Sequence, residues 1–400
     1  MAQIRPKTAE TNFKPVNILI LNHNHERFGT YFRCKFIAEE LTKHGHRVTM
    51  ICASGKNFDL KIRHHKSSAS FSIITLPRIK YSQYFTGQIL RLLFTLPYIF
   101  FADYDVAYAF TVAQPQIAIP AILSKKILKR PLIIDWDDLW GGGFAQAHHS
   151  FVAKILTFFE SHTPKYADHL TYASRFLGNE IKRLGLNIPM TYVPNGAHPK
   201  DQKQSSKKNS RKQTKLPLDK KLILSLGNTY TDSLRLMLKA FSKAISQNPN
   251  LNLVFVGNLV IPEKFQTLFN RFKSNITVVG TVPYQQVHLY LSAADSLILP
   301  MDNSPIEKAR FPMRFGEYLT SGRPLISNAV GDVRYFIKKY QCGYLTKPDD
   351  YVGLGKAMMA SVKPTERNRK YSSNSLKLAK TELNWATIGE KVNTIITKYA

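Results

Sequence analysis

The sequence is poor in acidic residues and in cysteine. Its 400 residues hold 27 aspartates and glutamates against 56 lysines and arginines, a formal net charge of +29. A surplus this large implies an anionic partner, which could be nucleic acid, an acidic membrane surface or a phosphorylated substrate. The three cysteines, Cys34, Cys52 and Cys342, are widely spaced and form no CxxC or metal-binding pattern. We therefore expect buried thiols in a reducing compartment.

Long hydrophobic runs are also missing. Residues 1–14 are polar and do not resemble a signal peptide, so we expect a cytoplasmic protein. The most membrane-like segment, Leu92–Ala102, is uncharged but interrupted by Pro97, and it is too short to span a bilayer. It predicts either a buried helix or a helix that lies in the headgroup region at the inner face of the membrane.

What the chain does contain is a globular α/β pattern, with 44% hydrophobic and 12% aromatic residues. A strand at Asn17–Leu21, a helix at Phe32–His44 and a strand at Val48–Cys52 form a βαβ unit, which predicts a parallel sheet. Short apolar strands continue to alternate with helical stretches, and a second such series starts at Leu222. The pattern predicts two doubly wound domains.

The boundaries follow from changes in composition. Lys200–Lys215 has almost no apolar residue, which predicts an exposed linker, with a membrane or polyanion tether as the alternative. We expect a first domain at 1–199, this basic linker at 200–215, a second domain at 216–373 and a helical tail at 374–400.

Glycines follow several predicted strands. Gly227, Gly257 and Gly280 each end a strand in the second domain, where open α/β sheets bind ligands. In the first domain, Gly29 stands in the loop after the first strand, but the loop does not match GxGxxG. Gly29 either lets the backbone approach a phosphate or serves as a simple turn glycine.

The stretch 297–326 predicts a strand, a helix between Pro312 and Gly322, and another strand. Spacing puts Arg314, Glu317, Tyr318 and Ser321 on one polar face of this helix, with Phe311, Phe315 and Leu319 on the packing face. The positive end of the helix, with Arg310 and Arg314 beside it, suits a diphosphate, and Glu317 suits sugar hydroxyls. The alternative is an ordinary amphipathic helix in which Arg314 and Glu317 pair.

Three carboxylates and two indoles follow another strand, in the run Asp135-Trp-Asp-Asp-Leu-Trp-Gly-Gly-Gly143. This position at the carboxyl end of a strand favours contacts to an acceptor or a sugar. Helix capping and metal binding are the alternatives, but no further ligand cluster accompanies Asp137 and Asp138, so we expect no metal.

Four segments together resemble the retaining glycosyltransferases of family 4: VPNG near residue 194, KHGHRVTMICAS, VVGTVPYQQVHLYLSAADSLILP and RFPMRFGEYLTSGRPLIS. The resemblance covers nearly the whole chain and implies the GT-B fold, in which two Rossmann-like doubly wound domains face a cleft. It implies a nucleotide-sugar donor held by the second domain and an acceptor bound by the first. The tail around Trp385 resembles the family's last helix, which packs back on the first domain.

The resemblance also assigns roles. Glu317 matches the second glutamate of the family's E-x7-E motif, which contacts the donor ribose, and Thr281 and Val282 would lie by the base. The full donor set is Gly29, Gly227, Asn228, Gly280, Thr281, Val282, Glu317 and Tyr318. The expected catalytic residues are Arg310, Arg314 and Asp137, and Asp135, Trp136 and Asp138 are expected on the acceptor side.

The chain departs from the family pattern in two places. Ala309 replaces the first glutamate of E-x7-E, and Asn228 and Asp232-Ser233 stand where the family often has Arg and Lys-Gly. We therefore expect Arg310 and Arg314 to neutralise the diphosphate, without a metal or other cofactor. The expected acceptor is a glycan, a lipid-linked or another cell-surface precursor. A degenerate protein that binds sugar nucleotide or polyanion without turnover remains an alternative, and nucleic acid is not expected.

Overall fold

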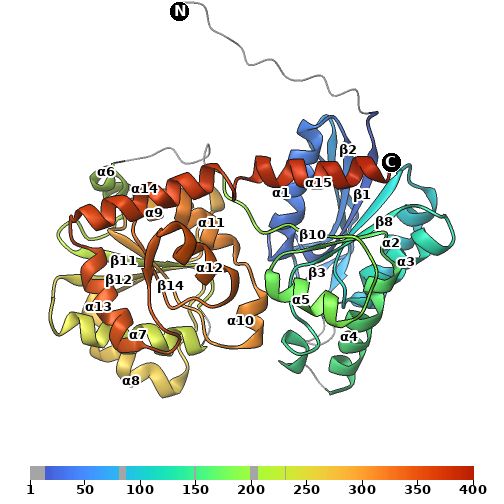
Figure 1. The fold of residues 1–400 in the computed structure, drawn as a ribbon. Helices are drawn as coiled ribbons and strands as arrows, with labels where there is room; N and C mark the ends of the chain where they lie inside the picture. Colours follow the sequence, from blue (N-terminus) through green and yellow to red (C-terminus); the bar gives the residue numbers. More distant parts are fainter. Residues whose placement is uncertain (1–13, 81–86, 148–149, 199–205, 230) are drawn as a thin grey trace, which may run out of the picture. The chain divides into compact units, whose positions relative to one another are not determined.

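The computed structural model describes residues 14–80, 87–147, 150–198, 206–229 and 231–400 (Figure 1). It contains two α/β arrays built on parallel sheets, which confirms the predicted pair of Rossmann-like domains. The chain divides into two compact units. The first holds the chain up to Ile134 together with Tyr166–His169 and Gly389–Ala400, and the second holds Asp135–Lys165 and Leu170–Ile388.

The first sheet has eight strands in the order β10-β9-β8-β7-β1-β2-β5-β4. Its edge strand β4 runs antiparallel to β5, whereas β1, β2, β5 and β7 pair in parallel. The strands are β1 (Asn17–His25), β2 (Arg47–Ala53), β4 (Arg63–Ser68), β5 (Phe71–Leu76), β7 (Val106–Phe110), β8 (Leu132–Trp136), β9 (His169–Tyr172) and β10 (Met190–Tyr192). A separate antiparallel pair joins β3 (Phe58–Asp59) to β6 (Arg78–Ile79).

The helices that follow these strands are α1 (Thr30–Lys43), α2 (Gln88–Phe101), α3 (Pro115–Lys126), α4 (Ser150–His162) and α5 (Arg175–Arg183). The predicted segment Leu92–Ala102 lies mostly in α2, but this helix is not fully buried as one interpretation required, because Leu93, Phe100 and Phe101 are exposed. Among the described residues, no helix combines the length and apolarity needed to cross a bilayer. All three cysteines are buried, as predicted.

The second sheet is parallel throughout, in the order β13-β12-β11-β14-β15-β16. Counted within this domain the order is 3-2-1-4-5-6, the Rossmann order, and it reverses between β11 and β14. The strands are β11 (Lys221–Leu226), β12 (Leu251–Val256), β13 (Ile276–Gly280), β14 (Ser296–Leu299), β15 (Leu325–Ser327) and β16 (Gly343–Leu345).

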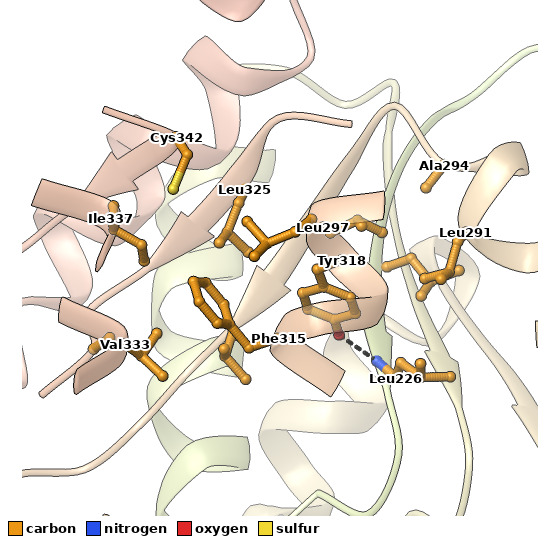
Figure 2. Packing of buried hydrophobic residues seen from close by; sticks show 14 of the residues in the cluster. Leu226, Leu291, Ala294, Leu297, Phe315, Tyr318, Leu325, Val333, Ile337 and Cys342 are labelled. Atoms are coloured by element: carbon orange, nitrogen blue, oxygen red, sulfur yellow. Dashed lines mark hydrogen bonds between the residues drawn. The ribbon is translucent and has the colours of Figure 1, made fainter. Parts of the chain in front are cut away.

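Both faces of this sheet are covered, because neighbouring side chains along each strand point to opposite faces. Leu224 joins one core cluster, whereas the adjacent Ile223 joins the other. The Leu224 side is covered by α9 (Val287–Ala293), α11 (Met313–Thr320), α12 (Gly331–Tyr340) and α14 (Glu366–Lys380) (Figures 1 and 2). The Ile223 side is covered by α7 (Thr231–Ile245), α8 (Glu263–Arg271) and α13 (Tyr351–Ser361).

The predicted basic linker is only partly a linker. Residues 200–205 lie outside the described residues, but the rest forms helix α6 (Lys207–Thr214), which Ser206 caps. Arg211 is buried, and its guanidinium donates to a carboxylate oxygen of Asp295 at 2.6 Å and to the carbonyl oxygen of Ala293. The charge run is therefore not fully solvated, because Asp295, distant in sequence, pairs with its single arginine.

The predicted helical tail, 374–400, holds the second half of α14 and the whole of α15 (Trp385–Lys398), with a break around residues 381–384. The later part of α15 packs on α1: a Cβ on Gly389 would lie 2.4 Å from the Cβ of Glu40. The imidazole of His46 hydrogen-bonds Asn393 at 2.6 Å.

Candidate functional site

The strand order of the second sheet reverses between β11 and β14, and this reversal is here called the switch point. Tyr318 lies at the switch point. The register between the two strands extends to Leu224 opposite Leu297. Beyond it, the Tyr318 hydroxyl accepts from the Leu226 amide at 2.7 Å (Figure 2) and donates to the Ile298 carbonyl at 3.2 Å. Tyr318 therefore bridges the two strands where they separate.

The position of Tyr318 contradicts one part of the prediction for the polar face of this helix. Tyr318 is 1% exposed and belongs to the hydrophobic core, so it does not lie on a polar surface with Glu317 as expected. The reason is that a phenol can pack as an aromatic residue when its hydroxyl finds partners, here two backbone groups. Tyr318 therefore holds the two strand ends together, and its side chain is not exposed at the surface.

Arg314, one turn earlier on α11, holds the same strand end. Its guanidinium donates to the carbonyl oxygens of Leu226 at 2.9 Å and Asn228 at 3.3 Å. These acceptors are neutral, so they position the guanidinium without cancelling its charge. The first turn of α11 follows Pro312, and no described side chain caps it. A full positive charge and a helix N-terminus thus meet at the end of β11.

Glu317 lies next to Arg314 on α11 and is half-buried. Burial raises the pKa of its carboxyl to about 7, although the nearby Arg314 charge lowers it. The group therefore titrates near neutral pH. When ionised, its carboxylate accepts hydrogen bonds only, which suits hydroxyl groups.

A glycine stands at the C-terminal end of each of β11, β12 and β13, the three strands on one side of the switch point. This confirms that each predicted glycine ends a strand. Gly227, Gly257 and Gly280 have φ values of +86°, +128° and +83°. A Cβ on Gly257 would lie 2.6 Å from the Gly227 carbonyl oxygen, so a side chain there would clash with the neighbouring strand. Past Gly280, Thr281 is exposed and Val282 packs against the core.

Arg310 lies outside helix α11, at the C-cap of the short helix α10 (Pro305–Ala309). Its guanidinium pairs with the carboxylate of Glu307 at 2.6 Å. The two arginines of the expected phosphate site therefore differ: Arg314 binds backbone carbonyls at the switch point, whereas the charge of Arg310 is shared with an acid.

The carboxylates after β8 also have different environments. Asp135 is completely buried and accepts a hydrogen bond from the Thr171 hydroxyl at 2.5 Å, which links β8 to β9. A side chain with no exposed surface cannot contact an acceptor, so the structure contradicts the acceptor-side role expected for Asp135. Trp136 is buried and its indole donates to the carbonyl oxygen of Asp138 at 3.0 Å. Asp137 and Asp138 are half-buried.

Glu160, which the sequence did not indicate as a site residue, holds the loop after β8 in place. Its carboxylate accepts from the amide of Trp140 at 2.6 Å and from the amide of Gly141. Burial raises the pKa of this carboxyl, although both amide hydrogen bonds lower it. Glu160 borders a cavity of about 310 Å³ that Trp136 also lines. Its only sequence signal is a single carboxylate in the apolar run before His162.

Gly29 lies in the loop after β1, where the order of the first sheet reverses. Its φ is +53°, and a Cβ there would lie 2.6 Å from the side-chain nitrogen of Asn24. Both the positive φ and the lack of room for a Cβ favour glycine at this position. A simple turn glycine and a glycine that lets the backbone approach a phosphate would both meet these conditions. In the part of the chain that the structure describes, no three His, Cys, Asp or Glu side chains gather as metal ligands.

Comparison with known proteins agrees with this architecture. The family model for glycosyl transferases group 1 matches residues 206–378, and the model for glycosyltransferase family 4 matches residues 33–201. A curated relative, the putative teichuronic acid biosynthesis glycosyltransferase TuaH of Bacillus subtilis, is 24% identical over 234 residues. That match covers 55% of this chain and 56% of TuaH, so it spans little more than half of the relative's length.

Solved structures share the fold over almost the whole chain. Sucrose-phosphate synthase from Thermosynechococcus elongatus has a TM-score of 0.76 at 17% identity and covers 96% of this chain and 98% of its own. HepE of Anabaena in complex with UDP-glucose has a TM-score of 0.70 at 14% identity and covers 96% and 100%. The chain thus belongs to the glycosyltransferases of family 4 and has the GT-B architecture of two Rossmann-like domains.

Proposed function

We propose that the protein is a retaining glycosyltransferase that moves a sugar from a nucleotide-sugar donor to a glycan, a lipid-linked or another cell-surface precursor. The observation that carries this proposal is Arg314, which is fixed at the switch point of the second sheet beside Glu317. A diphosphate at this point would meet the guanidinium, the N-terminus of α11 and the glycine backbone after β11. The ribose hydroxyls of the same ligand would meet Glu317.

Uridine diphosphate sugars are the first donors to test, because the structural relative HepE binds UDP-glucose. The proposed acceptor class is supported by TuaH, which is named for teichuronic acid biosynthesis. We propose that the reaction takes place at the inner face of the membrane, where a lipid-linked acceptor would be held.

In the proposed mechanism the protein contributes orientation and charge stabilisation. Arg314 stabilises the charge that develops on the leaving diphosphate, and Arg310 assists while it stays paired with Glu307. The leaving phosphate accepts the proton of the acceptor hydroxyl on the same face of the sugar, so no dedicated base is required. Asp137 is proposed to orient the acceptor hydroxyl. The guanidinium charges take the place of a metal ion.

The first experiment is a thermal-shift screen against UDP, GDP, ADP and their glucose conjugates. A ligand that binds only the folded state raises the melting temperature, so one nucleotide series should stand out. Release of that nucleotide in the presence of membrane extract then tests turnover. Binding without release would instead support a degenerate protein, and no shift with any nucleotide in folded protein would contradict the proposal.

A further inference from the structure

Helix α2 turns Arg91 and Thr95 toward the protein, whereas several of its large apolar side chains are exposed to solvent. Arg91, Thr95 and Ile99, spaced four residues apart, are buried. On other sides of the helix, Ile89 is 75%, Leu93 56% and Phe101 88% exposed. A helix on the surface of a water-soluble domain normally shows the reverse arrangement.

The buried side chains fix this orientation. The Arg91 guanidinium donates to the carbonyl oxygens of Asn22 and His23 near the end of β1. The Thr95 hydroxyl donates to the Arg91 carbonyl at 2.8 Å. Rotation of α2 to bury Leu93 would expose Arg91 and break both of its backbone hydrogen bonds. The outward apolar stripe is therefore a stable feature of the fold.

A second exposed apolar group lies beside α2, in β3 and in the segment that joins β3 to β4. Phe58, Leu60 and Ile62 are exposed at alternate positions, while Asp59 between them is buried and accepts from the Ser54 hydroxyl at 2.5 Å. Because Asp59 is held inward, its neighbours Phe58 and Leu60 lie on the outside.

Both ends of α2 contact these strands. Near its C-terminal end, the Tyr98 hydroxyl lies 3.4 Å from the His64 imidazole of β4. At its start, a Cβ on Gly87 would lie 2.9 Å from the carbonyl oxygen of Ile79, the strand partner of Phe58. Basic residues accompany the apolar ones: Lys56, Lys61, His64, His65 and Lys66 are all exposed.

We propose that α2 and residues 56–66, here called the α2 face, dock on an anionic lipid surface. Apolar side chains beside lysines and histidines are the combination that binds the interface of an acidic membrane. With 14 residues α2 is about 21 Å long, shorter than the roughly 30 Å hydrocarbon core, so it would lie in the interface. A second copy of the chain is a poor occupant, because both copies would carry a net charge of +29.

This inference deepens the membrane location proposed above, which rests on the proposed function, but it uses residues outside the donor site. The test is cosedimentation of the full chain with vesicles of phosphatidylcholine alone or mixed with phosphatidylglycerol. We expect binding to the mixed vesicles only. The double variant Ile89→Ser/Leu93→Ser should weaken it at least about tenfold, and Lys61→Glu/Lys66→Glu by a similar factor.

The matched control is Val260→Ser, which changes an equally exposed apolar residue of the second domain and should bind vesicles like the wild type. Equal binding by Ile89→Ser/Leu93→Ser and the wild type, or equal binding to both vesicle types, would overturn the proposal. So would a lipid-independent dimer that the double variant abolishes. The nucleotide-induced thermal shift, measured on the same samples, should be unchanged in the variant, so a failed docking test and a failed donor site give different results.

Discussion

Glu317 is the residue whose ionisation has the clearest consequence for stability. Its pKa is raised from 4.5 to about 7 in the folded protein. Between these values the folded state binds a proton that the unfolded state has lost, so stability falls as pH rises from about 4.5 to about 7 and then levels off.

Glu317→Gln should remove this fall. We expect the variant to unfold with a free energy about 1–3 kcal/mol higher than the wild type at about pH 8, with little difference at about pH 4.5, while donor binding weakens. Thermal unfolding at the two pH values, with and without nucleotide, measures both effects. A variant that is less stable than the wild type at the higher pH would show that the carboxylate stabilises the fold.

Tyr318 gives a second prediction at the level of a single residue. Tyr318→Phe leaves the Leu226 amide and the Ile298 carbonyl without their shared partner, which should cost about 1–3 kcal/mol. Denaturant unfolding measures this loss, with Tyr351→Phe on the surface as the control. If the two variants unfold alike, the hydroxyl does not join the strands.

At the level of elements, the loop after β8 depends on its glycines unequally. A Cβ on Gly143 would lie 2.3 Å from the Leu139 carbonyl oxygen, whereas a Cβ on Gly142 meets only a Leu139 methyl at 3.9 Å. Gly143→Ala should therefore destabilise the protein by about 1–3 kcal/mol and impair transfer, and Gly142→Ala should be close to neutral. Unfolding and activity assays on the two variants test this prediction, and equal effects of both substitutions would contradict it.

The same elements show what the sequence could predict. Strands β1, β2, β14 and β15 and the glycines that end β11, β12 and β13 follow from local patterns, and the sequence predicts them within a few residues, whereas β16 is not predicted. Strand β4 is not predicted, because its sequence RHHKSS contains no apolar residue. The sequence predicts a linker where the structure has helix α6. This helix is held by the pairing of Arg211 with Asp295, and a contact so distant in sequence leaves no local pattern.

At the level of the whole molecule, the two-domain architecture was predictable because each βαβ unit carries its own hydrophobic pattern. The details of the site were not, since Arg314, Tyr318 and Glu160 all act on backbone groups of other elements. Sequence spacing gives the face of a helix but not its distant partners. The sequence alone gives the net charge of +29. The structure adds that basic residues and exposed apolar residues lie together on the α2 face.

Arg314 is proposed to stabilise the leaving diphosphate at the switch point of the second sheet. The most direct test of this role compares sugar transfer by the wild type, Arg314→Ala and the surface control Arg369→Ala, with thermal unfolding as a check on folding. We predict that kcat falls about 10²–10³-fold in Arg314→Ala and is unchanged in Arg369→Ala. Near-normal turnover by folded Arg314→Ala would contradict it.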